Sequence, residues 1–213
     1  MSQHHLLDRA ATAFDNLAFD LRFGTDTHNR EQPNPSEMRS ANFEDAVGYM
    51  PTNARVFRSV MSSLDLPADS VFVDVGSGKG KVLMLATSYE FKEIVGIEVS
   101  KKLCDIARRN LNKLLESNNI KTNPRVIHSD IVDYHFSEEN VFFMYNPFHT
   151  AVMKQFIGNI SRSISENPRD IWIIYHQPFT PCRAVIEAAE FREIRCVKTG
   201  SAVFRIYRRR ITH

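Results

Sequence analysis

The chain has 213 residues, 43% of them hydrophobic and 24% charged, with a formal net charge of +2 at pH 7. These values are those of a globular domain with a full hydrophobic core, and so small a net charge says little about partners. No stretch approaches the ~18 apolar residues of a membrane span, and no charged leader precedes an apolar run at the N-terminus. The three cysteines, Cys104, Cys182 and Cys196, lack metal-ligand spacing, so we expect a cytoplasmic protein with reduced thiols, no metal and no membrane partner.

The first 50 residues differ from the rest of the chain. Apolar residues recur at helical spacing over about 5–22, which predicts an amphipathic helix. The polar stretch that follows contains Pro33 and Pro35 and predicts a long loop, which in a compact domain is either disordered or a functional lid. We therefore expect residues 1–50 to form a helical lid on a domain at 51–213.

A second helix is predicted after Pro51. Thr52 is a suitable N-cap, and the apolar face of the helix is Val56, Phe57, Val60, Met61 and Leu64.

From residue 71, short apolar runs rich in β-branched residues alternate with helix-like segments. The runs are 71–75, 93–99, 125–128, 141–146, 170–176, 191–198 and 202–208, and the helical segments lie near 80–90, 101–117, 150–165 and 181–189. Such alternation predicts a parallel sheet covered on both faces. Only three residues join the last two runs, which permits only an antiparallel hairpin. The expected fold class is α/β, a Rossmann-like sheet of seven strands, mostly parallel, with an antiparallel C-terminal strand.

A glycine-rich turn, DVGSGKGKV, follows the first of these strands and opens a helix. A nucleotide P-loop is excluded because Lys79 and Lys81 are followed by Gly80 and Val82, so no hydroxyl group is placed to reach magnesium. A dinucleotide site is disfavoured because its third glycine belongs at the position that Lys81 holds.

Three acids complete a different pattern. Asp74 precedes the glycines, Glu98 ends the next strand and Asp130 ends the third. A carboxylate at Glu98 can accept both hydroxyl protons of a ribose, and Asp130 with the next backbone N–H, that of Ile131, can meet an adenine edge. The carboxyl ends of strands form the ligand side of an open α/β sheet. The pattern describes a ligand with an amino-acid end, a ribose and an adenine, which is S-adenosylmethionine.

On these residues the sequence resembles the class I S-adenosylmethionine-dependent methyltransferases over about residues 45–208. The resemblance implies a seven-stranded sheet whose seventh strand is antiparallel, and S-adenosylmethionine as cofactor. The cofactor-binding residues that it implies are Tyr49, Thr52, Asp74, Gly76, Ser77, Gly78, Gly80, Glu98, Asp130, Ile131 and Asn146. Structural roles remain as alternatives: glycines for tight packing, Glu98 as a solvated strand end, Asp130 as the N-cap of a helix at 131–135, and both lysines as solvated helix residues.

The fourth strand ends in FMYNPFH. Asn146, Pro147 and Phe148 resemble the Asp/Asn/Ser-Pro-Pro-aromatic pattern of amino-group methyltransferases, with one proline missing. In that pattern the amide oxygen and the proline carbonyl accept hydrogen bonds from the amino group, and the aromatic ring stacks on the substrate. The missing proline weakens the inference to nucleobases, and the alternative is a turn with Phe148 buried below it.

The stretch Tyr49-Met50-Pro51-Thr52 resembles one in small class I lysine methyltransferases, where it helps to cover the cofactor. The wider resemblance is to bacterial class I methyltransferase domains of unassigned substrate. The alternative is a helix N-cap with a packed tyrosine.

Two further features bear on the acceptor. His176 ends the fifth strand and either removes a proton or forms a hydrogen-bonded wall. The C-terminal arginines Arg205, Arg208, Arg209 and Arg210 either meet nucleic-acid phosphate or belong to a solvated final strand.

We therefore predict a methyltransferase that uses no metal and transfers methyl from S-adenosylmethionine to a nitrogen of a protein side chain or small amine. Asn146, Pro147, Phe148 and His176 are the candidate catalytic residues, and Tyr49, Tyr145 and Phe148 can favour the sulfonium cation. The alternatives are a non-catalytic module that binds S-adenosylmethionine or a partner, and a nucleic-acid base N-methyltransferase. A nicotinamide-dependent oxidoreductase is disfavoured by the position of the third glycine.

Overall fold

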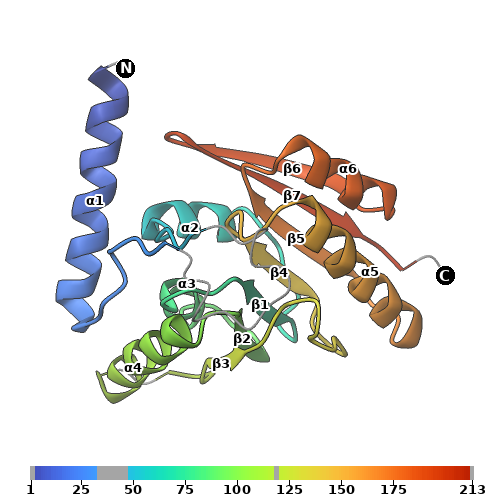
Figure 1. Ribbon diagram of the computed structural model, residues 1–213, viewed down its shortest axis with the longest axis horizontal. Coiled ribbons are helices and arrows are strands. Elements are labelled where there is room, and N and C mark those ends of the chain that lie inside the picture. Colours follow the sequence, from blue (N-terminus) through green and yellow to red (C-terminus); the bar gives the residue numbers. More distant parts are fainter. Residues whose placement is uncertain (1–2, 33–47, 118–119, 212–213) are drawn as a thin grey trace.

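The computed structural model describes residues 3–32, 48–117 and 120–211, with side chains from residue 12. Pro33 and Pro35 of the predicted loop lie outside the described residues. Six helices are described: α1 (Gln3–Phe23), α2 (Ala54–Met61), α3 (Lys81–Ala86), α4 (Lys101–Ser117), α5 (Thr150–Glu166) and α6 (Thr180–Ala188). The seven strands are β1 (Val71–Val75), β2 (Glu93–Glu98), β3 (Arg125–His128), β4 (Val141–Met144), β5 (Ile171–His176), β6 (Arg192–Thr199) and β7 (Ala202–Arg209) (Figure 1).

All seven strands form one sheet in the order β3-β2-β1-β4-β5-β7-β6. Neighbouring pairs from β3 to β5 are parallel, whereas β7 is antiparallel to both β5 and β6. The predicted fold class is therefore confirmed, including the reversed strand. The strand order changes direction between β1 and β4, and in open α/β sheets ligands bind beyond the carboxyl ends of the strands at such a point.

Alternate residues of the central strands enter two separate hydrophobic clusters, one on each face of the sheet. In β1, Val71, Val73 and Val75 belong to the cluster that α5 and α6 cover. Phe72 belongs to the cluster on the opposite face, which α2, α3 and α4 cover. Because side chains alternate along a strand, a strand buried on both faces is apolar throughout, as its sequence indicated.

The helix α2 begins one residue later than predicted. Its N-cap is Asn53, whose side chain accepts hydrogen bonds from the amides of Arg55 and Val56, so the prediction that Thr52 caps it is wrong. The predicted alternative of a helix at 131–135 is also wrong, because those residues form only a turn.

Within the described ranges, no helix is long and apolar enough to cross a membrane. Cys104 and Cys182 are buried and Cys196 is exposed, all as free thiols.

Candidate functional site

The glycine turn joins β1 to α3 and is tied to the end of β2. Gly76, Gly78 and Gly80 all have left-handed backbones, with φ of 73°, 53° and 82°, a region that glycine enters at little cost. The amides of Gly76 and Ser77 both donate to the carbonyl of Ile97, at 2.9 and 3.1 Å. The turn is thereby held against the strand that ends in Glu98.

The two acids predicted at this turn are buried. Glu98 is 6% exposed and accepts the amide of Gly78 at Oε2 (2.9 Å) and that of Ser100 at Oε1 (2.8 Å). Burial raises the pKa of Glu98 despite these bonds. Burial also raises the pKa of Asp74 well above its ordinary value, and the neighbouring Glu98 adds to the shift. Two carboxyl groups in one poorly solvated site favour a ligand that brings hydroxyl donors or a positive charge.

The end of β3 carries the predicted adenine site. Oδ1 of Asp130 accepts the amide of Val132 at 3.1 Å, within the turn, and Asp130 is only half-buried. The side chain of Ile131 is 7% exposed and packs in the core, which leaves its backbone as the part that can face a ligand.

The end of β4 meets the glycine turn. A Cβ atom added at Gly76 would lie 2.7 Å from Cβ of Pro147, so only glycine lets the two strand ends approach this closely. Asn146 has a left-handed backbone (φ 51°), and its Oδ1 is buried without a hydrogen-bond partner among the described residues. A strained backbone and an unpaired buried acceptor at one residue are features of functional sites.

Phe148 lies below this turn. It is 5% exposed, belongs to the core and packs edge-on against Phe156. This placement matches the alternative of a buried aromatic residue and leaves the ring little surface for stacking on a substrate.

The end of β5 lies beside that of β4, where Met144 pairs with Tyr175. The next residues, Tyr145 and His176, stack with ring centroids 3.8 Å apart and planes 6° apart. His176 is 5% exposed, its Nδ1 has no partner among the described residues, and burial lowers its pKa to about 4. The imidazole is therefore neutral at pH 7 and can accept a hydrogen bond, but it is a weak proton acceptor.

Tyr49 covers the glycine turn. A Cβ atom at Gly78 would lie 2.1 Å from Cδ2 of Tyr49, so the ring rests directly on the glycine backbone. The Tyr49 hydroxyl donates to the carbonyl of Thr27 at 2.7 Å. Thr52, at the end of the same stretch, is 4% exposed.

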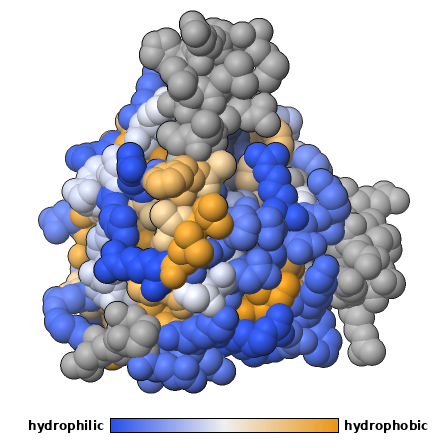
Figure 2. Space-filling view, turned by 90° about the vertical axis from the view of Figure 1, so that its left-hand side faces the viewer, coloured by the Kyte–Doolittle hydropathy of each residue, from blue (hydrophilic) through white to orange (hydrophobic). Residues whose placement is uncertain are grey.

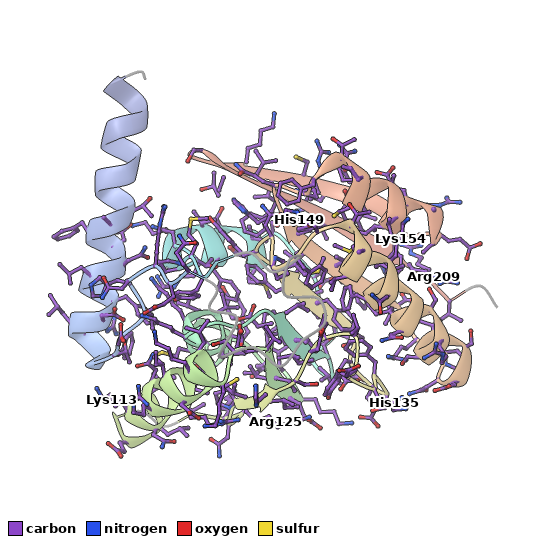
Figure 3. The ribbon with its side chains drawn as sticks, viewed as in Figure 1. Lys113, Arg125, His135, His149, Lys154 and Arg209 are labelled. Carbon is purple, nitrogen blue, oxygen red and sulfur yellow. The ribbon has the colours of Figure 1, made fainter. Side chains whose placement is uncertain are left out.

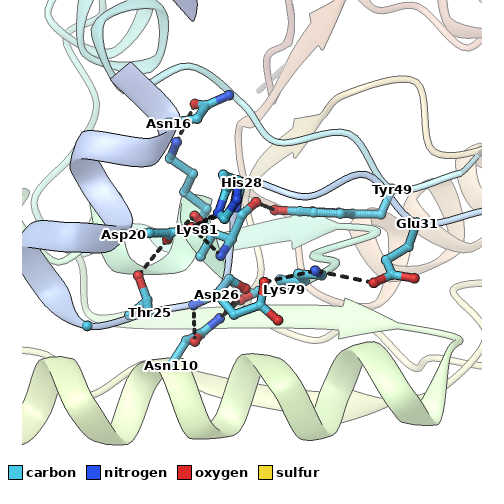
Figure 4. Close-up of polar contacts among 12 residues, drawn as sticks. Asn16, Asp20, Thr25, Asp26, His28, Glu31, Tyr49, Lys79, Lys81 and Asn110 are labelled. Atoms are coloured by element: carbon cyan, nitrogen blue, oxygen red, sulfur yellow. Dashed lines mark hydrogen bonds and ion pairs between the residues drawn. The ribbon is translucent and has the colours of Figure 1, made fainter. Parts of the chain in front are cut away.

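Lys79 and Lys81 are both 1% exposed, so the reading of them as solvated helix residues is wrong. Nζ of Lys79 lies 3.1 Å from Asp26 and 3.3 Å from Glu31, and Nζ of Lys81 donates to Asn16 at 2.5 Å (Figure 4). Burial lowers the pKa of Lys81 to about 8. The two lysines thus anchor the N-terminal segment to the glycine turn, a role that no spacing in the sequence indicates.

Asp20 organises that segment. Its carboxylate accepts the hydroxyl groups of Thr25 and Thr27 and the amides of Thr27 and His28, and it pairs with the ring of His28. Burial by itself would raise the pKa of Asp20, but these hydrogen bonds outweigh it and the pKa is lowered. Asn110 of α4 binds both backbone groups of Asp26, which fixes the segment to a second helix (Figure 4).

The C-terminal arginines are largely neutralised. Arg205, Arg208 and Arg209 pair with Glu193, Asp170 and Glu190. Figure 3 shows the labelled basic residues Lys113, Arg125, Lys154 and Arg209 spread around the molecule. Neither observation favours a nucleic-acid surface. No group of three metal-ligating side chains occurs in the part of the chain with described side chains.

A family model described as "Histone methylation protein DOT1" matches residues 31–195, more than half of the chain. A comparison with curated proteins found no match. Among solved structures, the chain is similar to an RNA methyltransferase from Salinibacter ruber in complex with S-adenosyl-L-homocysteine, at 20% identity and a TM-score of 0.56, over 75% of this chain and 92% of that one.

Two other similar structures differ in their named acceptors. One is a precorrin-6y C5,15-methyltransferase from Geobacter metallireducens, at 16% identity and a TM-score of 0.57, over 74% of this chain and 88% of that one. The other is a ribosomal protein L11 methylase from Lactobacillus delbrueckii subsp. bulgaricus, at 12% identity and a TM-score of 0.56, over 84% of each chain. The names of these three similar proteins refer to an RNA, a precorrin and a protein as acceptors. The fold therefore does not define the acceptor.

Proposed function

The chain belongs to the DOT1 family of histone methylation proteins, and from that premise we propose that it transfers the methyl group of S-adenosylmethionine to a nitrogen of a protein side chain or small amine. The family confirms the methyltransferase predicted from the sequence. The observation that carries the choice of nitrogen is the unpaired, buried Oδ1 of Asn146 beside the glycine turn.

The residues of the site fit the cofactor. Glu98 uses one lone pair on each oxygen for a backbone amide, which leaves acceptor capacity on both for a ribose diol. Asp74 is buried beside Glu98, and its carboxyl group can bind the ammonium group at the amino-acid end of S-adenosylmethionine. The hydroxyl group of Ser77 is buried without a partner among the described residues and can bind the carboxylate at the same end. When bound, S-adenosylmethionine supplies a methyl group on a positively charged sulfur.

Asn146 positions the acceptor. Its free amide oxygen requires a hydrogen-bond donor, which an N–H supplies, and a nitrogen held there keeps its lone pair for in-line attack. Nδ1 of His176, at the neighbouring strand end, also lacks a partner and can accept a second hydrogen bond. A site with two such acceptors favours an amine, because an amino group can donate two hydrogen bonds whereas a hydroxyl group can donate only one. The proton that the nitrogen loses passes to solvent, because neutral His176 with a pKa of about 4 holds it weakly.

The alternatives are less well supported. A nucleobase acceptor is disfavoured by the ion-paired arginines and by the missing second proline after Asn146. A non-catalytic module gives no reason for an unpaired amide oxygen in a strained turn at the junction of β1 and β4.

The test is transfer of a labelled methyl group to lysate proteins, RNA and small amines, followed by analysis of the methylated atom. Asn146→Ala is expected to leave affinity for S-adenosylmethionine nearly intact and to lower the transfer rate by a few-fold to about tenfold, the effect of one hydrogen bond of ~0.5–1.5 kcal/mol. Asn112→Ala, at an exposed asparagine on α4, is the control. Methyl found on oxygen, carbon or sulfur would refute the assignment to nitrogen.

A further inference from the structure

The helix α1 exposes an apolar stripe. Phe14, Leu17 and Leu21 are 71%, 43% and 76% exposed, and they follow one another at intervals of three and four residues. In the sequence, Ala10 and Leu7 continue the same intervals toward the N-terminus. Spacing of this kind is the a/d pattern of a coiled coil. We call Phe14, Leu17 and Leu21 the α1 seam.

The α1 seam is distinct from the face of α1 that packs on the rest of the protein. Asn16, Phe19 and Asp20 form the packed face and are 5%, 8% and 4% exposed. Asn16 binds Lys81, and Phe19 lies in the core cluster. A helix docked on one face normally presents polar residues on the other, so the core of this protein does not account for the seam.

Arg22, beside Leu21 at the end of α1, is exposed, but the exposed residues before it with described side chains carry no charge. Between residues 12 and 21, the exposed residues are Ala13, Phe14, Leu17, Ala18 and Leu21. Asp15 is turned to the body, where it pairs with Arg55 of α2. Figure 2 shows the apolar patch at the centre of this face, among hydrophilic residues. The alanines beside the seam are small enough for a second helix to approach closely.

We propose that the α1 seam joins two copies of this chain as a two-stranded coiled coil. A twofold interface uses the same patch on both subunits, and an uncharged apolar stripe is complementary to itself. A histone tail or a nucleic acid would bring charges that the seam cannot pair. A membrane surface needs a basic polar face, whereas α1 contains three aspartates and two arginines.

The size of the helix sets the strength of the association. Its 21 residues extend for about 31 Å, or three heptads. A standard stable interface buries ~800 Å² per partner, more than one such stripe provides, so we expect a dimer with a Kd of about 1–100 μM. The association also bears on the site, because α1 continues directly into the segment that Asp20 and Lys81 hold on the glycine turn.

Sedimentation velocity across that concentration range tests the proposal with three proteins. Wild type is expected to shift from 24.5 kDa toward twice that mass as concentration rises. Phe14→Lys/Leu21→Lys is expected to remain monomeric. Ile194→Lys is the matched control, because Ile194 is also a large exposed apolar residue (50%) but lies on β6, an edge strand of the sheet.

Each outcome decides the proposal. A wild-type protein that stays monomeric overturns it, as does a seam variant that dimerises like wild type or a dimer lost only in Ile194→Lys. Circular dichroism checks that the variants fold, which we expect because the replaced side chains are exposed. If the double variant does not fold, Ala18→Glu places a charge beside the seam without removing an apolar side chain, and it must also weaken the dimer.

Discussion

Replacing His176 with phenylalanine should make the protein more tolerant of acid. Burial lowers the pKa of this imidazole from 6.5 to about 4. Between these two pH values the unfolded chain binds a proton at His176 that the folded chain rejects. Stability therefore falls as pH drops through 6.5, and the loss from this group levels off below about 4. Phenylalanine cannot titrate, and it keeps an aromatic ring against Tyr145 and Phe204.

The magnitude follows from the two pKa values. At pH 5, one proton bound with a pKa of 6.5 in the unfolded state and about 4 in the folded state costs about 2 kcal/mol of stability, and at pH 7 almost nothing. For a domain of this size, 2 kcal/mol corresponds to about 4–8 °C in Tm.

Urea unfolding at pH 7 and pH 5 measures the effect as a double difference. The wild type is expected to lose about 2 kcal/mol more than His176→Phe between the two pH values. His135→Phe, which replaces an exposed histidine, is the control for a generic effect of losing an imidazole (Figure 3). Equal losses in wild type and His176→Phe would show that His176 is not buried as a neutral ring, and the argument about its role beside Asn146 would fail with it.

Three further predictions concern the glycine turn and its anchors. Glu98→Gln removes the negative charge of the buried carboxylate that is proposed to accept the ribose hydroxyl groups, and it should weaken S-adenosylmethionine binding by ~1.5–3 kcal/mol. Unchanged affinity in calorimetry would eliminate the ribose assignment. Gly78→Ala should lower the Tm, because its Cβ would lie 2.1 Å from Tyr49, and Tyr49→Ala in the same chain should restore part of the loss; strictly additive effects would contradict the contact. Burial lowers the pKa of Lys81 from 10.5 to about 8, so between these pH values the unfolded chain binds a proton that the folded chain lacks, and stability rises with pH. Lys81→Met should abolish the part of the increase in Tm between pH 8 and pH 10 that comes from this group. An unchanged increase in Tm would mean that the amine is solvated.

The parts of the fold that the sequence predicts well are those decided by neighbouring residues. The seven strands are recognisable because each is a short apolar run, and the hairpin of β6 and β7 because only three residues connect them. The positions of Glu98 and Asp130 at strand ends follow from the same runs. Local patterns suffice where burial on both faces dictates local composition.

The burial of Lys79 and Lys81 had no such local signal. Their partners, Asp26 and Asn16, lie more than 50 positions away, so only the folded chain brings them together. The start of α2 was missed for a different reason. Thr52 and Asn53 are both good cap residues by type, and only the folded backbone shows that the side chain of Asn53 accepts the first amides of the helix.

The contact between Tyr49 and Gly78 bears on how quickly ligands exchange. The ring rests on the glycine, its hydroxyl group is held by Thr27, and Thr27 is held by Asp20, so the three contacts form a series. We therefore expect a ligand seated on the glycine turn to leave past Tyr49 only when the whole series opens. On that expectation, the opening of the protein segment governs residence time, and product departure is predicted to be the slow step of turnover.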